Sequence, residues 1–311
     1  MNELNSTLQS LVDNISRVVV GKEHTIRLVI ASLLSHGHVL LEDKPGVGKT
    51  MLARALAKSI DCDFKRIQCT PDLLPVDITG YFDPRSREFR PGPVFTNILL
   101  ADELNRATPR TQSALLEAMG ENQVSVEGVT YQLPKPFIVI ATQNPVEHRG
   151  VNDLPEAQLD RFQLLLTPGY PSAEEEKRVL LERQSSDPLE SLGPVMNISQ
   201  LQAIMTEVLK VTMSESLVDY VITLVRATRE SSLLYVGASP RCALQLMHLS
   251  RAFALLENRT YVVPDDVKQL ASHVLPHRVS PNSSSTETMN TTEWKQEIIR
   301  RIIESTKVPH G

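Results

Sequence analysis

The chain has 311 residues, of which 41% are hydrophobic and 22% are charged, and its formal net charge is −5. A chain of this length can bury a sizeable core and divide into two domains. The negative net charge gives no overall attraction to nucleic acid or to an anionic membrane, although a local basic stripe remains compatible with it. Nucleic-acid binding is therefore disfavoured from the start.

Cysteine usage and hydropathy predict where the protein resides. Cys62, Cys69 and Cys242 form no C-x-x-C pair, which is typical of reduced thiols in a cytosol rather than of disulfides or a zinc site. The first thirty residues include Glu3 and Asp13 among the apolar positions, and the chain contains no apolar run of about 18 residues. We therefore expect a cytoplasmic protein with no signal peptide and no membrane span.

Short apolar runs alternate with helical patterns between residues 38 and 170. The runs are too short for stable helices and are mostly apolar on both faces, as in a parallel sheet that is covered on both sides. Between them, apolar residues recur at helical spacing over residues 49–60 and 109–119. This alternation predicts an α/β core domain over residues 1–170. The predicted strands are 38–41, 64–69, 98–101, 137–141 and 163–166.

The pattern changes after Pro171, where no further strand is predicted. Ser172 and Glu175 form a capping box, which marks the start of a helix. We predict a smaller, all-helical domain over residues 171–279. Its predicted helices cover residues 174–184, 201–210, 216–229, 241–257 and 265–274.

The remaining residues divide into a polar tract and an amphipathic segment. Residues 280–292, SPNSSSTETMNTT, lack apolar anchors and are predicted to form a flexible linker. Apolar side chains recur at helical spacing in residues 293–311, which predicts a C-terminal helix. One amphipathic helix cannot bury its stripe alone, so it packs either on its own domain, which we favour, or on a partner. The stripe consists of Trp294, Ile298, Ile299, Ile302 and Ile303.

One loop nearly matches the phosphate-binding pattern G-x-x-x-x-G-K-[ST]. In the sequence LLEDKPGVGKT, Asp43 takes the place of the first glycine. Gly46 and Gly48 allow the backbone to approach phosphates closely. Lys49 supplies an ammonium group for the phosphates, and Thr50 supplies a hydroxyl for Mg²⁺. The short polar side chain of Asp43 can support an unusual turn, so we interpret the segment as a variant nucleotide-binding loop.

Two carboxylates, Asp102 and Glu103, follow the strand predicted at 98–101. In this arrangement the first acid supports Mg²⁺ and the second orients and deprotonates a water molecule. A solvated helix cap would explain the pair alone, but not its occurrence downstream of a phosphate loop. The two motifs together predict binding of a nucleotide with Mg²⁺, and the resemblance described below implies that this nucleotide is ATP or ADP.

Three further polar residues follow in suggestive contexts. Asn144 comes just after the strand predicted at 137–141, where its amide could hold the attacking water or the terminal phosphate; turn chemistry is the alternative explanation. Arg161 lies in LPEAQLDRF, and Arg241 lies in GASPR at the start of a predicted helix. A lone arginine is generally a surface residue, so the two arginines gain meaning only from a wider resemblance.

Six ordered motifs make the chain similar to the MoxR branch of the AAA+ ATPases over roughly residues 10–280, with the tail outside the resemblance. The resemblance implies an AAA+ P-loop core, a smaller helical lid domain, and a ring, commonly a hexamer, that hydrolyses ATP. The motifs are LLEDKPGVGKT, ILLADELNRATPRTQSALLEAM, ATQNPVEHRG, LPEAQLDRF, GASPR and NRTYVVPDDV.

The resemblance also implies a role for individual residues. Glu103 would activate water, Asn144 would be sensor 1 and Arg241 the sensor 2 residue of the lid. Arg161 would be a finger supplied to the nucleotide of a neighbouring subunit. Such an arginine contributes on the order of 10³ to 10⁵ in rate, so a monomer would be nearly inactive. The implied nucleotide contacts are Val20 and Gly21 beside adenine, then Pro45, Gly46, Val47, Gly48, Lys49, Thr50, Met51 and Asp102, with Thr50 and Asp102 on Mg²⁺.

Two inserted segments bear on what such an ATPase acts on. Residues 123–131 alternate apolar and polar side chains around Glu127 and Gly128, which predicts a hairpin. Residues 80–84 are followed by a group of basic residues. Each segment either faces a ring pore or is an ordinary surface loop. The basic group consists of Arg85, Arg87 and Arg90.

Three functions remain open. MoxR relatives are associated with chaperone-like remodelling of protein partners, often with von Willebrand factor A domain proteins, in metal-cofactor insertion or complex maturation. A hairpin tip whose only charge is Glu127 favours this function. A DNA-dependent motor would require basic pore loops, for which the three arginines are the only support. A non-hydrolysing nucleotide switch would have no need of Glu103, Asn144 and Arg161.

Overall fold

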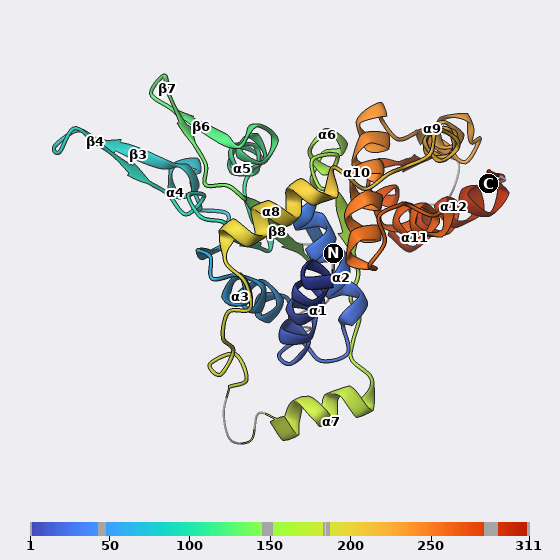
Figure 1. Ribbon diagram of the computed structural model, residues 1–311. Helices are drawn as coiled ribbons and strands as arrows, with labels where there is room; N and C mark the ends of the chain where they lie inside the picture. The colour runs from blue at the N-terminus through green and yellow to red at the C-terminus, as the bar shows by residue number, and fades with distance from the viewer. Residues whose placement is uncertain are drawn as a thin grey trace.

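The computed structural model describes residues 2–42, 48–144, 152–182, 184, 187–282 and 292–309. A sheet lies at the centre, two β-hairpins extend from one side of the molecule, and a group of helices lies on the other side (Figure 1). Within the described residues, no helix combines the length and the apolar character needed to cross a bilayer.

The central sheet has five strands, all parallel, in the order β2-β5-β8-β1-β9. All five predicted strands occur in it and differ from the prediction only at their ends. The edge strand β2 departs from the expected apolar character, because Lys65, Arg66 and Gln68 are exposed on it. The bounds are Val39–Glu42 (β1), Phe64–Gln68 (β2), Ile98–Asp102 (β5), Ile138–Gln143 (β8) and Leu164–Leu166 (β9).

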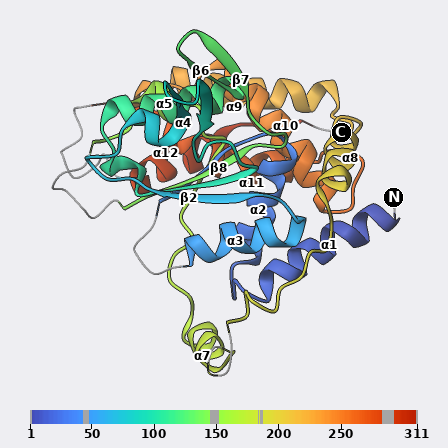
Figure 2. The same cartoon turned by 90° about the vertical axis from the view of Figure 1, so that its left-hand side faces the viewer.

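Alternate residues of the strands supply two apolar clusters, one on each face of the sheet, as the two-residue period of a strand requires. Val39 and Leu41 belong to the cluster that contains α1, α2 and α3, whereas Leu40 belongs to the cluster that contains α5. Figure 2 shows α1 and α3 on one side of the sheet and α5 on the other. The helical bounds are Asn2–Ser16 (α1), Glu23–Leu34 (α2), Lys49–Ile60 (α3), Pro75–Thr79 (α4), Leu104–Arg106 (η1, a 3₁₀ turn), Pro109–Glu121 (α5) and Glu156–Leu159 (α6).

Two antiparallel hairpins interrupt this alternation. Strands β3 (Gly80–Asp83) and β4 (Glu88–Pro91) form the first, and β6 (Gln123–Val126) and β7 (Val129–Gln132) form the second. The predicted turn at Glu127 and Gly128 is confirmed, with φ of 50° and 81° at the two residues, as in the turns that match strand twist. Phe89 of the first hairpin stacks on Tyr131 of the second with ring centroids 3.9 Å apart.

The second half of the chain is helical as predicted, apart from a short ribbon that the sequence analysis missed. Strand β10 (Leu234–Val236) pairs antiparallel with β11 (Ser280–Pro281), which lies at the start of the predicted linker. Strands this short carry too few residues for an alternating pattern to be detected. Residues 283–291 of that linker lie outside the described residues. The helices are Ala173–Glu182 (α7), Ile198–Val208 (α8), Glu215–Glu230 (α9), Pro240–Leu256 (α10), Pro264–Val274 (α11) and Pro276–Arg278 (η2, a 3₁₀ turn).

The amphipathic C-terminal segment forms α12 (Thr292–Ser305) and packs on its own chain. Ile298, Ile299 and Ile302 are buried in the larger apolar cluster, and Trp294 lies partly buried against it. The helix contacts α9, α11 and η2. The favoured expectation, that the stripe is covered by the chain itself, is confirmed within the described residues.

Candidate nucleotide site

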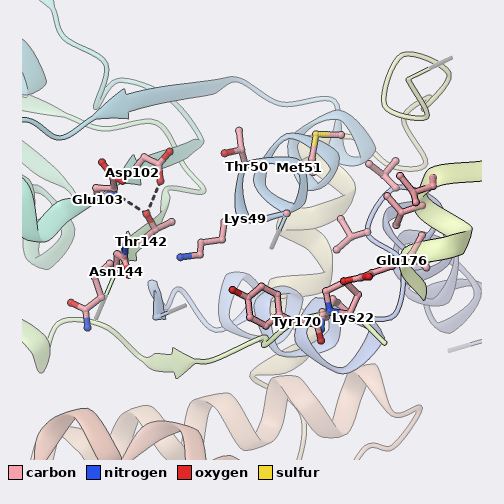
Figure 3. Close-up of a pocket in the computed structure, with 18 residues that line it drawn as sticks. Lys22, Lys49, Thr50, Met51, Asp102, Glu103, Thr142, Asn144, Tyr170 and Glu176 are labelled. Atoms are coloured by element: carbon pink, nitrogen blue, oxygen red, sulfur yellow. Dashed lines mark hydrogen bonds between the residues drawn. The ribbon is translucent and has the colours of Figure 1, made fainter. Parts of the chain in front are cut away.

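A cavity of about 700 Å³ lies at the carboxyl ends of the sheet strands, where α3 begins (Figure 3). This volume falls within the range of roughly 300–1,000 Å³ that is usual for small-molecule sites. Its walls come from the segment before α2, the start of α3, the ends of β5 and β8, and helix α7. Residues that are far apart in the sequence therefore share one cavity.

The start of α3 supplies the phosphate-binding character of the cavity. Gly48 caps the helix with φ of 87°, a conformation that glycine adopts without a Cβ clash, and Lys49, Thr50 and Met51 line the cavity. The amides at a helix N-terminus attract anions because they point outward and carry the positive end of the helix dipole. The Lys49 side chain points across the cavity toward the strand ends that carry Thr142 and Asn144 (Figure 3). Asp43, Pro45, Gly46 and Val47 lie outside the described residues.

The two carboxylates at the end of β5 are held by Thr142 on the neighbouring strand β8. The Thr142 hydroxyl donates to Asp102 Oδ1 over 2.6 Å and accepts from the Glu103 amide over 2.8 Å. Arg66 on β2 donates to the other oxygen, Asp102 Oδ2, over 2.6 Å. Asp102 thus faces the cavity with both oxygens oriented by neighbouring side chains.

The Glu103 carboxylate is oriented separately. Its backbone adopts φ of 55°, in the left-handed region that non-glycine residues rarely occupy. Oε2 accepts from Gln68 over 2.7 Å and from Arg106 over 3.1 Å. These contacts, together with the Thr142 bond to its amide, offset the strain and hold Glu103 on the wall of the cavity.

Asn144 lines the cavity just beyond the end of β8, beside a buried polar contact at the base of the nucleotide-binding loop. Gln143 donates to Glu42 over 2.9 Å, and the Thr292 hydroxyl at the start of α12 donates to the same carboxylate over 2.6 Å. Glu42 is the last described residue before the loop. The C-terminal helix therefore begins next to the end of β1, a contact that the sequence did not predict.

The opposite side of the cavity is mainly apolar and suits a planar base. Val20 lines it, and Gly21 lies beside it with φ of 75°; a Cβ there would approach Glu175 Oε1 to 2.0 Å. Lys22 donates to the carbonyls of Pro168 and Tyr170, over 2.8 and 3.2 Å, and so ties this segment to the chain that leads into α7. The apolar lining consists of Val18, Val19, Val20, Met51, Tyr170, Pro171, Val179 and Leu180.

Two predicted site residues, Arg161 and Arg241, do not line the cavity. Arg161 lies three residues before the first residue of β9, and its Nη1 donates to the Leu116 carbonyl over 2.6 Å. Arg241 is exposed near the start of α10, and its charge contributes to lowering the pKa of His38, which precedes the amino end of β1. Both arginines therefore lie at the amino edge of the sheet, opposite the cavity of their own chain.

Comparison with known proteins relates this site to a family. The model of the ATPase family associated with various cellular activities (AAA) matches residues 38–164, and an AAA lid domain model matches residues 226–302. The chain is 41% identical to chaperone MoxR1 of Mycobacterium tuberculosis, over 88% of this chain and 75% of that protein. It is 32% identical to protein MoxR of Paracoccus denitrificans, over 84% of this chain and 85% of the relative.

The chain belongs to the MoxR family of AAA+ ATPases. YeaC of Bacillus subtilis, an uncharacterized protein, is 49% identical to it over 99% of this chain and 96% of YeaC. The crystal structure of a protein assigned as an ATPase from Cytophaga hutchinsonii matches with a TM-score of 0.89 at 37% identity, and covers 99% of this chain and 96% of that chain. The predicted AAA+ fold with a lid is confirmed.

The match to the AAA lid domain corrects one expectation about the tail. The matched lid extends to residue 302 and so includes most of α12, whereas the sequence analysis placed the tail outside the resemblance. The apolar face of α12 explains this, because its isoleucines complete the same cluster as the lid helices.

Several residues around the MoxR-family site were missed from the sequence. Gln68 and Asp102 are register partners at the ends of β2 and β5, and Thr142 lies near the end of β8. Parallel strands end at one edge of the sheet, so polar residues at strand ends are the signal that could have found Gln68 and Thr142. Arg66 and Arg106 carry no comparable signal, because exposed arginines are common on any surface.

The site fits Mg²⁺ bound together with a nucleotide. A threonine hydroxyl and one carboxylate oxygen are the hard ligands that Mg²⁺ takes from protein when phosphates and water supply the rest. Thr50 and Asp102 face the same cavity. Within the described part of the chain, no group of three or more His, Cys, Asp or Glu residues could hold a metal.

Proposed function

We propose that this AAA+ ATPase hydrolyses ATP with Mg²⁺ in a ring of several subunits and uses the hydrolysis to remodel partner proteins, as a chaperone-like protein of the cytoplasm. One observation carries the ATPase site: Lys49, Thr50, Asp102, Glu103 and Asn144 line a single cavity at the carboxyl edge of the sheet. Each has the chemistry that phosphoryl transfer to water requires.

The chain's own residues perform distinct tasks in this proposal. The α3 amides and Lys49 bind the phosphates, and the apolar side of the cavity takes the base. Thr50 and Asp102 hold Mg²⁺, which neutralises phosphate charge when bound. Glu103 accepts a proton from the attacking water, and Asn144 orients that water or the terminal phosphate.

The placement of Arg161 supports a ring. Arg161 lies at the amino edge of the sheet, so it cannot reach the nucleotide of its own chain without crossing the sheet, whereas a neighbouring subunit docked at that edge would receive it. A head-to-tail contact of this kind repeats and closes into a ring when the rotation allows it. We infer a ring, commonly of six subunits in this family. Arg241 lies at the same edge and would act across the same interface.

The two hairpins support a protein partner. A groove of about 360 Å³ lies between them and α5, lined mainly by apolar and uncharged polar residues such as Val76, Tyr81 and Val124. Val76 and Tyr81 are about half exposed, at 47% and 53%. Contiguous exposed apolar surface of this kind marks a protein-binding site more often than a nucleic-acid site. Chaperone MoxR1 is named for such a role, and we extend it to this chain.

The DNA-dependent motor receives less support. One of the three arginines of the first hairpin, Arg90, forms an ion pair in which its Nε lies 3.9 Å from Asp83 Oδ2. Asp83 also accepts a hydrogen bond from the Arg85 amide. A strand tip with an acidic residue among its arginines is a weak anchor for a phosphate backbone.

A nucleotide-dependent capture experiment tests the proposal. A Glu103→Gln variant should bind ATP without hydrolysing it and should retain a von Willebrand factor A domain protein of the same organism in a pull-down. Wild-type protein with ATP should release that partner as it turns over. Equal retention with and without ATP would contradict the remodelling function. Full cellular function of the variant would instead favour the nucleotide switch.

A further inference from the structure

One side chain connects the segment of Arg161 to the helix of Arg241. The Asp160 carboxylate accepts a hydrogen bond of 2.9 Å from Nε of Arg278, which lies in η2. It also accepts from the Ser239 hydroxyl over 3.2 Å at Oδ2. Ser239 is the N-cap residue of α10, two positions before Arg241, and Asp160 immediately precedes Arg161.

Arg278 holds the rest of this segment from the lid side. Its side chain is 1% exposed, and it donates to the carbonyls of Phe162 and Gln163 as well as to Gln245 and Val274. A buried cation persists only when hydrogen bonds and a counter-charge satisfy it. Its acceptors lie on α11, on α10 and in the segment before β9, so this guanidinium fixes three elements relative to one another.

Arg161 is half-buried, and the contacts of its neighbours hold the backbone on both sides of it. His277 donates through Nε2 to the Phe162 carbonyl over 2.9 Å, and burial lowers its pKa well below the usual value, so the ring is neutral. The Arg161 guanidinium points instead to the Leu116 carbonyl on α5, where Gly120 leaves room for it. The residues on both sides of Arg161 are thus anchored, while its own side chain lies at the edge of the sheet.

We propose that Asp160 and Arg278 are positioning residues that fix Arg161 and Arg241 as one unit for presentation to the nucleotide of a neighbouring subunit. The inference rests on the proposed function, in which Arg161 acts across a subunit interface. Pre-organised donors stabilise transition-state charge because they need no reorganisation during the reaction. A displacement of about 1 Å at such a group can reduce the rate on the order of a hundredfold.

The first test uses Asp160→Asn with a matched control. The substitution should lower kcat on the order of tenfold to a hundredfold and leave the affinity for a fluorescent ATP analogue unchanged, because the cavity lies at the other edge of the sheet. The control is Asp266→Asn, which disrupts a different charged pair, the part-buried bidentate pair of Asp266 with Arg259 at 2.6 and 2.7 Å. This control should weaken folding without lowering kcat. An equal fall of kcat in both variants would overturn the inference.

The second test uses mixed rings. Asp160→Asn subunits keep an intact cavity, and Glu103→Gln subunits keep an intact arginine unit. Co-expressed rings of the two should recover about a quarter of wild-type activity, because half of the subunits have an intact cavity and half of these receive an intact neighbour across a head-to-tail interface. A variant that is merely less stable gains nothing from this mixing.

A reference pair separates this inference from the function on which it rests. Arg161→Ala mixed with Glu103→Gln should recover activity if the arginine acts across the interface. Recovery with Arg161→Ala but not with Asp160→Asn would overturn the positioning role and leave the proposed function standing. Failure of both mixtures would overturn the interface role of Arg161 itself. If Asp160→Asn fails to fold, Ser239→Ala replaces it, because this change removes only a hydroxyl contact. Its kcat should fall less than that of Asp160→Asn, and its activity should also recover in rings mixed with Glu103→Gln.

Discussion

The hydroxyl of Thr142 orients both acidic residues of the candidate site. It contacts the carboxylate of Asp102 and the amide of Glu103 at once, and so joins the predicted Mg²⁺ ligand to the predicted base. Glu103 depends on that contact because its left-handed backbone is otherwise unfavourable. The chain thus fixes the two acids from the neighbouring strand β8, which lies outside the motif that contains them.

We predict that Thr142→Val lowers kcat on the order of tenfold to a hundredfold, since the two acids lose their shared orientation. Valine keeps the shape of threonine, so the fold should be retained. Thr142→Ser keeps the hydroxyl and serves as the control, with activity near that of the wild type. Steady-state ATP hydrolysis and nucleotide affinity are measured for both variants, and a Thr142→Val protein with wild-type kcat would refute this role.

A buried histidine makes stability depend on pH. His38 is buried, donates from Nε2 to the Met119 carbonyl and accepts from the Val139 amide at Nδ1, and burial lowers its pKa to about 4. The folded pKa lies below the unfolded one, so this contribution is complete above about pH 6.5 and is lost as the pH falls toward 4. His38 alone should reduce the free energy of unfolding by about 2 kcal/mol between pH 7 and pH 5.

Urea unfolding at the two pH values checks this prediction. His38→Gln cannot take up the proton, so its stability should be lower at pH 7 but should change less between pH 7 and pH 5 than that of the wild type. Identical pH dependence in the two proteins would show that His38 does not carry the effect. The other histidines whose pKa values burial lowers contribute to the pH dependence of both proteins; they are His24, His36, His248, His273 and His277.

At the scale of elements, the sequence predicted the longer strands and helices, but it did not predict very short strands or contacts between distant elements. The buried strands and capped helices were predicted because apolar burial and end chemistry both mark them, as at α3 and α5. The ribbon of β10 and β11 was missed because each strand is too short to show a period. The C-terminal helix was predicted, but it was placed outside the lid, because its contacts with α9 and α11 cannot be read from its own sequence.

Helix α12 should therefore stabilise the isolated subunit. Ile298 is fully buried in the larger apolar cluster. Ile298→Ala should therefore lower the free energy of unfolding by roughly 2–5 kcal/mol, because less apolar surface is buried on folding and a cavity is left behind. Glu304→Ala on the exposed side of the same helix should change it by less than about 0.5 kcal/mol. Unfolding of a dilute, monomeric sample measures both, and an unchanged Ile298→Ala protein would mean that a partner covers this face.

At the scale of the whole molecule, the candidate site residues at the carboxyl edge of the sheet could be predicted from motifs and strand ends. Those at the amino edge were predicted only through the family resemblance. Lys49, Asp102 and Asn144 lie in one cavity because each follows or ends a strand of the same parallel sheet. Arg161 and Arg241 lie at the opposite edge, where a single chain offers no nucleotide. The loop residues Pro45, Gly46 and Val47 remain sequence predictions. The roles that we propose for the two arginines require an assembly, and an assembly cannot be read from strand and helix patterns.

ATP hydrolysis per subunit, measured against protein concentration without any partner, tests the central claim most directly. We expect the specific activity to rise with concentration as subunits assemble. Arg161→Ala should abolish the activity and leave nucleotide binding intact, because a neighbour's cavity would lose its arginine. Activity that is independent of concentration, or that survives in Arg161→Ala, would contradict a site completed between subunits.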